Sequence, residues 1–297
     1  MNPVHLQTLL AIVDEGSFEY AAATLGVSPS AVSQRIKALE RHVGRVLVRR
    51  TGRTTATEAG EILVQAARRM ALLQDETNAQ LSGRLERVPL SVAVNADSLA
   101  TWFRPVLADV AAFGNATLRL RIEDESHTLA LLRRGDVLGA ITREATPVSG
   151  CQATALGSMY YRAVATPQLR EAYTFDGEID WAHLPALRFG PNDTLQDVDL
   201  QGRLDAAVRR RRVISQIPSS EGFLEAARAG LGWALVPELQ ASPLLESGEL
   251  VALDDTVAEV ALYWQCWRLE SELLEKLSQA VTKAAGVVPD SGMAQGF

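Results

Sequence analysis

The apolar positions along the N-terminal part of the chain recur at helical spacing and predict three successive helices. The first spans residues 3–15. The second follows Ser17, whose hydroxyl can cap its first turn, and ends at Gly26, which tolerates a left-handed backbone. The third starts at once, with Ser28 as its cap and Pro29 at its first position, where the missing N–H loses nothing. Two short helices joined by so tight a turn predict a helix–turn–helix.

The third predicted helix has one apolar face and one polar face. Its apolar row consists of Val32, Ile36, Leu39 and Val43. Its opposite row consists of Ser30, Ser33, Gln34, Lys37 and Arg41, with Arg35 on the flank. Gln and Ser can hydrogen-bond to base edges and Arg and Lys hold phosphates, whereas a helix that only faces water usually carries Glu/Lys pairs. The pattern therefore favours a DNA-recognition helix over an ordinary antiparallel helix pair.

Residues 46–56 predict a short two-stranded wing. Residues 46–48 form an apolar strand, residues 54–56 can return as a second strand, and an arginine-rich tip with one glycine lies between them. Such a tip can hold phosphate or enter a minor groove. By itself this tip also fits a solvated hairpin. Because it lies beside the predicted helix–turn–helix, we favour DNA binding. The residues predicted to contact DNA are Ser28, Pro29, Ser30, Ser33, Gln34, Arg35, Lys37, Arg41, Arg49, Arg50, Thr51 and Arg53.

A long helix is predicted from a cap at Thr57 to about Arg87. Its apolar seam, with spacings of four and three, consists of Ala59, Leu63, Ala66, Met70, Leu73 and Thr77. About thirty helical residues span roughly 45 Å, which is more than one small winged domain can cover. We therefore expect this helix to pair with a second copy. The alternative is a helix that folds back on its own chain.

From Leu90 onward, predicted strands alternate with helices. A first set has strands at 90–95, 118–124 and 137–142 and helices at 98–113 and 128–134. A second set has strands at 153–156, 162–166, 213–217 and 233–236 and helices at 167–172, 200–210, 221–229 and from 237. This order predicts a mainly parallel sheet with helices on both faces. A strand at 263–267 and a helix at 270–285 would return to the first set.

The predicted fold class is α/β, with a winged helix–turn–helix and a linker helix before two α/β lobes that resemble a periplasmic-binding-protein fold. The predicted units are a DNA-binding domain at 1–58, a linker at 59–87, an effector domain at 88–286 and a frayed tail at 287–297. Within the effector domain, lobe I takes about 88–161 and 267–286, and lobe II takes about 162–266.

The N-terminal motifs resemble those of the LysR-type transcriptional regulators. The matching positions are Gly16, Ser17, Phe18, Ala21, Ala22, Leu25, Ser28, Ser30, Ala31, Val32, Ser33, Ile36, Leu39, Glu40, Gly44, Arg49, Arg50, Thr57, Ala59 and Gly60. Further along, NADSLATWF, LLRRGDVLGAIT and PSSEGFLEAARAGLGWALVPE resemble the ArgP/LysG branch, which responds to basic amino acids. The resemblance covers about residues 2–286. It implies a ligand between the lobes and a tetramer built from two kinds of dimer.

Charge is distributed unevenly along the chain. The net charge is −7, but residues 1–60 hold seven Arg or Lys and five Asp or Glu, a balance of +2 that leaves −9 elsewhere. Phosphate contact needs only a local basic patch. The N-terminus lacks a basic signal-peptide region and no apolar run could span a bilayer, so we expect a cytoplasmic protein without a membrane partner. Cys151 and Cys266 lie far apart and predict no disulfide.

Polar residues at the predicted strand ends indicate a ligand pocket between the lobes. Asp97 or Ser98 would cap the helix after the first strand, and its free N–H groups suit a carboxylate, while acids from both lobes suit a cation. Each feature alone also fits simple helix capping or a solvated charge, and the resemblance decides for lysine, arginine or histidine. The predicted effector-binding residues are Asp97, Ser98, Thr101, Glu123, Asp124, Thr142, Asp193, Asp197 and Glu221.

Motifs of enzymes are absent from the sequence: there is no Gly-x-Ser-x-Gly, no phosphate loop and no His-Glu-x-x-His, and the four histidines are scattered. No catalytic residue, metal or cofactor is predicted, and a diffuse α/β catalytic site is the enzyme alternative. The predicted function is a regulator that binds double-stranded DNA as a homodimer or homotetramer and alters RNA polymerase access. By the resemblance, it would respond to a basic amino acid and control genes for basic amino-acid export or metabolism. The alternative is an architectural DNA-binding protein or replication-initiation inhibitor without ligand control.

Overall fold

Three helices and a wing form the N-terminal domain, as predicted. The computed structural model describes residues 2–50, 52–82, 87–123, 125–190, 193, 195, 200–286 and 288. The first elements are α1 (Pro3–Glu15), α2 (Phe18–Leu25), α3 (Pro29–Val43) and the paired strands β1 (Val48–Arg49) and β2 (Thr55–Ala56). The predicted caps are confirmed, because the Ser17 and Ser28 hydroxyls accept hydrogen bonds from the Tyr20 and Ala31 amides at 3.1 and 3.2 Å.

The apolar faces of these helices meet in one small core. Leu9 and Ile12 of α1 pack with Val32, Ile36 and Leu39 of α3, and each of these side chains is at most 1% exposed. Burial of such side chains contributes roughly 1.5–3 kcal/mol apiece. The core therefore fixes the rotation of α3 and turns its polar row outward.

The linker helix α4 (Glu58–Ser82) starts at the predicted cap, where the Thr57 hydroxyl accepts a hydrogen bond from the Gly60 amide at 3.1 Å. Residues 83–86, where the predicted helix would have continued, lie outside the described part. Of the predicted seam, Leu63 is buried against the N-terminal domain, whereas Met70, Leu73 and Thr77 are exposed. A different face of α4 packs against the first lobe. The helix thus folds back on its own chain along one face and leaves part of its seam uncovered.

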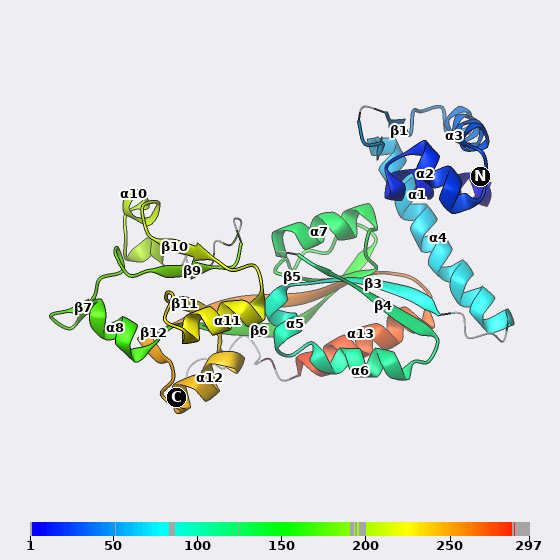
Figure 1. Ribbon diagram of the computed structural model, residues 1–297. Coiled ribbons are helices and arrows are strands. Elements are labelled where there is room, and N and C mark those ends of the chain that lie inside the picture. The colour runs from blue at the N-terminus through cyan, green and yellow to red at the C-terminus, as the bar shows by residue number, and fades with distance from the viewer. Residues whose placement is uncertain are drawn as a thin grey trace.

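Lobe I is built on the parallel strands β3 (Val88–Val94), β4 (Ala116–Ile122) and β5 (Gly139–Thr142). Its helices are α5 (Ala96–Ala100), α6 (Arg104–Ala112), α7 (Glu125–Arg134) and α13 (Glu272–Ala285). Figure 1 shows α6 and α13 on one face of the sheet and α7 on the other. The predicted single helix at 98–113 is wrong: Trp102 and Phe103 turn into the core, and a new helix starts around Pro105.

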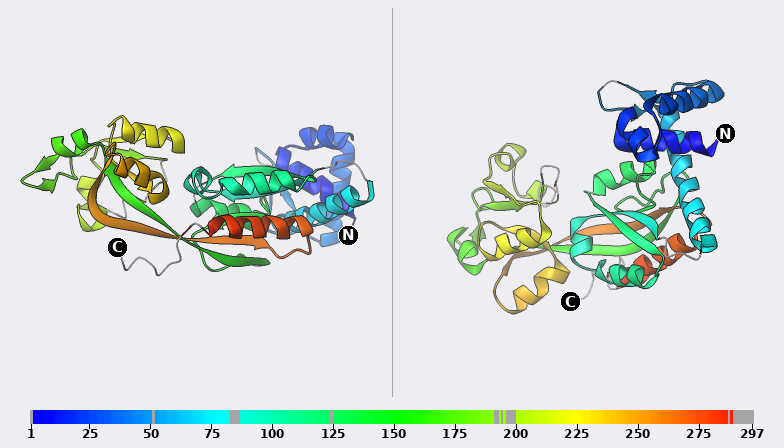
Figure 2. Two further views of the ribbon diagram at one scale, coloured as in Figure 1. Left: turned by 90° about the horizontal axis from the view of Figure 1, so that it is seen from below. Right: turned by 45° about the vertical axis from the view of Figure 1, so that its right-hand side comes forward.

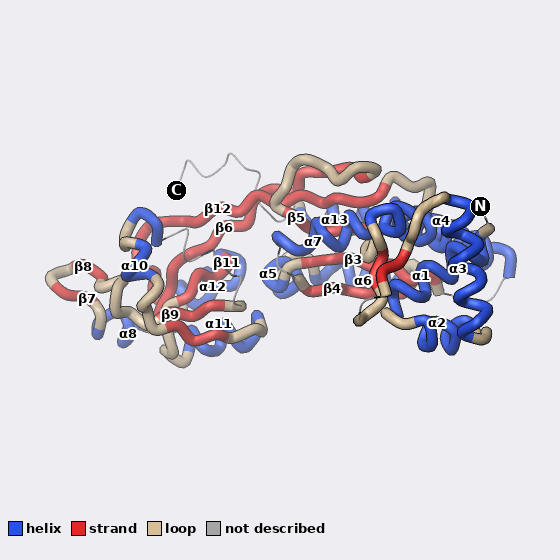
Figure 3. Tube along the Cα trace, turned by 90° about the horizontal axis from the view of Figure 1, so that it is seen from above, coloured by secondary structure: helices blue, strands red, loops and turns tan. Residues whose placement is uncertain are grey.

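Lobe II lies at the far end of the molecule from the N-terminal domain (Figure 3). Its strands are β9 (Ala186–Arg188), β10 (Ile214–Gln216), β11 (Ala234–Pro237) and the small hairpin of β7 (Thr174–Phe175) and β8 (Glu178–Ile179). Its helices are α8 (Pro167–Ala172), α10 (Ala206–Arg209), α11 (Ser220–Arg228) and α12 (Glu238–Glu246), with a short 3₁₀ turn at Leu200–Gly202. The predicted long helix at 200–210 is therefore two short pieces, and β7, β8 and β9 were not predicted.

Two long antiparallel strands, β6 (Cys151–Ala165) and β12 (Val251–Trp267), run through both lobes (Figure 2). They join the parallel strands in one sheet of order β11-β6-β12-β5-β3-β4. The sequence predicted them as shorter pieces, because the ladder shifts register between Leu262 and Tyr263 and breaks the alternation of side chains. Gly157 lies at this bulge with a φ of +97°, a conformation that favours glycine. The bulge marks the crossing between the lobes.

Candidate nucleic-acid interface and effector cleft

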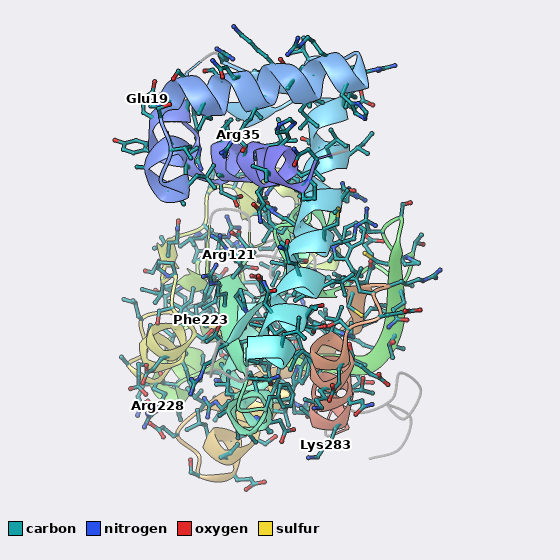
Figure 4. The ribbon with its side chains drawn as sticks, turned by 90° about the vertical axis from the view of Figure 1, so that its right-hand side faces the viewer. Glu19, Arg35, Arg121, Phe223, Arg228 and Lys283 are labelled. Carbon is teal, nitrogen blue, oxygen red and sulfur yellow. The ribbon has the colours of Figure 1, made fainter. Side chains whose placement is uncertain are left out.

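α3 presents its polar row at the outer end of the molecule (Figure 4). The exposed members are Ser28, Pro29, Ser30, Gln34, Lys37 and Arg41, and Ser33 is half-buried. The opposite face of the helix is fixed in the core, so this row cannot turn inward. A helix held in this way can enter a major groove, which is about 12 Å wide, with its first turns towards the base edges.

Two hollows flank the polar row. One, of about 450 Å³, lies between the starts of α2 and α3 and the wing, and is lined by Ser17, Pro29, Ser30, Ser33 and Arg50 among others. Arg50 brings a cation to this hollow, and Glu19, whose carboxylate accepts from the Ser17 hydroxyl at 3.0 Å, brings an acid.

The second hollow, of about 530 Å³, lies beside the last turns of α3, where Lys37 and Arg41 line it together with Arg45. Arg45 was missed in the predicted set, although an exposed cation four residues after Arg41 continues the same row. The acid in this hollow is engaged elsewhere: the Glu40 carboxylate accepts a hydrogen bond from the Leu47 amide at 2.9 Å. Three cations therefore dominate this end of the helix.

The remaining predicted arginines divide into two groups. Arg35 lies on the α1 side of α3, where its guanidinium is 3.5 Å from the Thr8 hydroxyl (Figure 4). Arg53 donates to the backbone oxygen of Asp14 at 3.3 Å, so both of these side chains brace the domain. Arg49 and Arg50 are exposed on the wing, and the Arg50 guanidinium stacks 4.3 Å from the Phe18 ring beside the first hollow. Thr51 lies outside the described residues.

The lobes approach each other where α5 faces α11 (Figure 1). The cap of α5 is Asn95, whose extended backbone carries a carbonyl that accepts from the Leu99 amide at 3.1 Å. The prediction that Asp97 or Ser98 caps this helix is therefore wrong, because both lie within its first turn. Ser98 is fully buried, with its hydroxyl 3.6 Å from the Met159 sulfur.

Asp97 is tied to the crossing strand β6. The buried Tyr161 donates a hydrogen bond to its carboxylate at 3.0 Å, and the Thr101 hydroxyl donates to its backbone oxygen at 2.6 Å. Nothing in the sequence singles out Tyr161, which lies in the middle of a long strand. Glu123 follows β4, is exposed, and its amide lies 3.3 Å from the Val94 oxygen, directly before Asn95. Asp97 and Glu123 are therefore brought to one end of the sheet.

Other predicted effector residues have structural partners. Thr142 is buried, and its hydroxyl donates to the Glu144 carbonyl at 3.3 Å and accepts from the Gln265 amide at 3.4 Å. The Asp193 carboxylate accepts from the Phe189 and Leu195 amides at 3.0 and 3.1 Å, which closes its own loop. Asp124 and Asp197 lie outside the described residues.

The start of α11 lies on the lobe II side of the contact with α5. The Ser219 hydroxyl caps it by accepting from the Gly222 amide at 3.2 Å, and Glu221 is exposed in its first turn. The Ser220 hydroxyl is buried and has no hydrogen-bond partner within the described residues. A buried hydroxyl without a partner costs about 1–3 kcal/mol, so Ser220 is a candidate ligand contact that sequence reasoning did not name.

The two thiols lie on opposite faces of the sheet. Cys151 pairs with Trp267 and Cys266 with Gln152 in the β6–β12 ladder, and both side chains are buried. Burial raises the pKa of the Cys151 thiol to about 12, and the neighbouring Cys266 adds to the rise. Among the described residues, no group of His, Cys, Asp or Glu could hold a metal ion, and none of the helices has the length and hydrophobicity to cross a bilayer.

We expect Cys151 to resist thiol reagents. A pKa near 12 leaves the thiol protonated throughout the neutral range, and the reactive thiolate forms only as the pH approaches that value. Titration with a chromogenic disulfide at pH 8 should detect close to no thiol in the native protein and both thiols after denaturation. Rapid modification of a native thiol at pH 8 would show that the buried site opens.

Two family models match the chain. The model described as "Bacterial regulatory helix-turn-helix protein, lysR family" matches residues 3–61, and "LysR substrate binding domain" matches residues 83–286. The chain belongs to the LysR family of bacterial transcriptional regulators. The family prediction, the two-lobed α/β fold and the assignment as a DNA-binding regulator rather than an enzyme are confirmed.

Individual LysR relatives match over nearly the whole chain. The lysine export transcriptional regulatory protein LysG of Corynebacterium glutamicum is 64% identical over 285 residues, 96% of this chain and 98% of that protein. A full-length structure of that LysG with bound effector Arg matches with a TM-score of 0.85 at 61% identity, covering 97% and 100% of the chains. A second full-length structure of it matches with a TM-score of 0.66 at the same identity and coverage. ArgP from Mycobacterium tuberculosis matches with a TM-score of 0.84 at 40% identity, covering 96% and 98%.

Proposed function

We propose that this LysR regulator controls transcription in response to arginine or lysine bound between its lobes. The observation that carries the proposal is that α5 and α11 contact each other across the two lobes. Helix α5 carries Asp97, whose carboxylate is held by Tyr161, and α11 starts with the buried hydroxyl of Ser220. The relatives support the choice of ligand, since the structure of C. glutamicum LysG has bound Arg and that protein is named for lysine export.

The cleft suits both ends of a basic amino acid. The start of α11, with the Ser220 hydroxyl, would receive the carboxylate, because free backbone N–H groups at a helix N-terminus favour an anion. Asp97, oriented by Tyr161, would receive the α-ammonium group. Glu123, at the end of β4 next to Asn95, would face the side-chain cation. Asp124, Thr142, Asp193, Asp197 and Glu221 remain predictions.

A thermal-shift screen of the twenty amino acids tests this proposal directly. Arginine and lysine should stabilise the protein, because a ligand at 100 times its Kd adds about 2.7 kcal/mol. Asp97→Asn and Ser220→Ala should each weaken ligand binding about tenfold or more, whereas Asp255→Asn, an exposed acid of lobe II, should leave it unchanged. If no amino acid stabilises the protein, an architectural DNA-binding role without ligand control is favoured instead.

Ligand binding would act on DNA through the relative position of the lobes. β6 and β12 are the described connections between the lobes, and their bulge at Gly157 is a natural hinge. Closure over the ligand would change the spacing of the paired DNA-binding domains, and with it DNA bending and RNA polymerase access. The targets would be genes for basic amino-acid export or metabolism, reached in the cytoplasm. We retain the proposed units 1–58, 59–87, 88–286 and 287–297.

The uncovered face of α4 supports a dimer through this helix. Its exposed apolar side chains are Ile62, Met70, Leu73 and Leu81, with exposed fractions of 63, 48, 37 and 80%. They recur at helical spacing on one side, as in a helix that pairs with a second copy. A tetramer would add a second kind of contact between effector domains.

We expect Met70→Glu with Leu73→Glu to dissociate the α4 pair. Four like charges in a symmetric apolar seam are costly, so the molar mass by light scattering should fall by half or more. The control is Gln74→Glu with Asn78→Glu, which adds the same charge on a neighbouring exposed face and should leave the mass unchanged. An unchanged mass in the first variant would place the dimer contact elsewhere.

A further inference from the structure

The helix α4 has three distinct faces along its length. At 3.6 residues per turn, Leu63, Val64 and Ala67 share one face, which is buried in the core of the DNA-binding domain. The exposed apolar residues of the proposed dimer seam occupy a second face. A third face points to lobe I and carries Gln65, Arg68, Arg69, Leu72 and Glu76. The helix therefore touches both functional parts of its own chain.

Most contacts of the third face reach lobe I alone. Gln65 donates to the Arg133 carbonyl, and the Arg69 guanidinium lies 4.8 Å from the Trp267 ring. Glu76 accepts a hydrogen bond from Ser271 at the start of α13. These contacts fix α4 to the effector domain at several points along its length.

Arg68 differs from these residues because it contacts both the DNA-binding domain and lobe I. Its Nη2 pairs with the carboxylate of Asp14, in the last turn of α1, and its Nη1 pairs with that of Asp136, after α7. Nη1 also lies 3.3 Å from the Arg134 carbonyl, and the Arg134 guanidinium holds Asp136 from the other side at 2.8 Å. A planar guanidinium can serve two carboxylates at once, which a lysine ammonium does less well.

The pairing spans an open groove between the DNA-binding domain and lobe I. This groove has a volume of about 870 Å³, with Leu10, Val13 and Asp14 on one wall and Arg121, Leu131 and Asp136 on the other. Figure 4 shows Arg121 on the lobe side, below the N-terminal helices. Since the walls are separated by this space, the Arg68 side chain bridges a gap that apolar packing does not fill.

The ion pair between Arg68 and Asp136, on the lobe I side of the bridge, is stabilised by its surroundings. Burial alone would raise the pKa of Asp136, but hydrogen bonds and charge from Arg68 and Arg134 outweigh it and hold the pKa below its usual range. The Asp136 side chain is 23% exposed and that of Arg68 16%, so solvent screens this pair less than a surface pair. Asp14, at 49% exposed, is the looser end.

We propose that Arg68 is a positioning residue that locks the DNA-binding domain to lobe I and carries the state of the effector cleft to the recognition helix. Without the bridge, the two parts would remain folded and attached to α4 by its other contacts, but the distance between them would fluctuate more. The two structures of C. glutamicum LysG match this chain with TM-scores of 0.85 and 0.66, so they differ from each other in overall arrangement. The regulatory half of this inference depends on the proposed arginine response.

The test uses full-length Arg68→Gln and Arg68→Lys, with Arg133→Gln as the matched control. Arg133 lies on α7, next to the contact between α4 and lobe I, and its side chain is exposed. Its replacement by glutamine removes the same charge as Arg68→Gln. Asp14→Asn is a second test variant that breaks only the looser end and leaves no buried charge unpaired. For each protein, calorimetry gives the arginine Kd, and a duplex selected from a random library by the wild type gives the DNA Kd with and without arginine.

In Arg68→Gln and Asp14→Asn, we expect the ratio of the two DNA affinities to fall at least fivefold towards one, while the arginine Kd changes less than twofold. Arg68→Lys should keep part of the coupling, and Arg133→Gln all of it. Wild-type coupling in both folded test variants would overturn the proposal. A loss of arginine affinity equal to the loss of coupling would also overturn it, since that outcome means a damaged cleft.

A ligand-independent measurement separates this inference from the proposed function. Spin labels at Tyr20→Cys on α2 and Leu107→Cys on α6, both exposed positions, report the distance between the DNA-binding domain and lobe I within one chain diluted among unlabelled copies. The distance distribution should broaden in Arg68→Gln and Asp14→Asn but not in Arg133→Gln. If arginine fails to bind the wild type, the proposed function is wrong. The distance distribution still tests whether Arg68 holds the DNA-binding domain against lobe I. Distributions as narrow as in the wild type would refute it.

Discussion

Gly60→Ala is expected to destabilise the DNA-binding domain by about 3 kcal/mol, although alanine normally favours a helix over glycine. A Cβ at this position would lie 2.0 Å from the Leu47 carbonyl oxygen and 3.0 Å from its carbon. That oxygen also accepts a hydrogen bond from the Thr57 amide at 2.9 Å, so the backbone before the wing is held directly against the first turn of α4. The methyl group can be accommodated only if the wing and the linker helix move apart.

Chemical denaturation followed by circular dichroism measures the loss of unfolding free energy. In Gly60→Ala, we expect the N-terminal helices to unfold at a lower denaturant concentration than the effector domain. Gly202→Ala is the control, because a Cβ there meets no atom within 4 Å. A midpoint for Gly60→Ala equal to that of the wild type would mean that the wing yields easily.

Replacing Lys37, Arg41 and Arg45 by glutamine is expected to weaken DNA binding by two to three orders of magnitude at low salt. These cations line the hollow beside the last turns of α3, and the nearby Glu40 carboxylate is engaged with the Leu47 amide. Binding of each phosphate releases counterions, so the slope of log K against log salt should become shallower by about 0.9 for every phosphate that the variant no longer binds.

The matched control removes three exposed arginines from the effector side, Arg87, Arg133 and Arg268, for the same change in net charge. It should keep both the affinity and the slope. Fluorescence anisotropy on a labelled duplex gives both the DNA affinity and the salt slope. The salt concentration should run from about 50 to about 300 mM, where phosphate contacts dominate binding. Equal slopes for the two triple variants would remove this end of α3 from the interface.

The N-terminal domain could be predicted almost completely, because its determinants are local. Ser17, Gly26, Ser28 and Pro29 act within a few residues of themselves, and helical spacing alone assigns each residue of α3 to a face. Gly60 shows the limit of this reasoning. Its place in the family pattern was visible, but its cause, the approach of the Leu47 carbonyl, depends on a contact thirteen residues away.

The crossing strands were predicted only in fragments, because their extent is set by each other. Residues of β6 pair with β12 about one hundred positions later, and the bulge at Gly157 interrupts the alternation on which a strand prediction relies. The same dependence on tertiary structure limits the effector site. Nothing local reveals that Tyr161 holds Asp97, or that the Asp193 carboxylate closes its own loop. Arg68 pairs with Asp14, 54 positions earlier in the chain, and with Asp136, 68 positions later. No local sequence pattern reveals contacts over such separations.

The most direct test of the account is sequence discrimination by α3. Ser33→Ala with Gln34→Ala should reduce the ratio of selected-duplex to random-duplex affinity by about 5- to 150-fold, the equivalent of about 1–3 kcal/mol for each base that α3 no longer reads. Gln7→Ala with Thr24→Ala, exposed polar residues elsewhere in the same domain, should leave the ratio unchanged. A folded Ser33/Gln34 variant with undiminished discrimination would show that another surface reads the DNA.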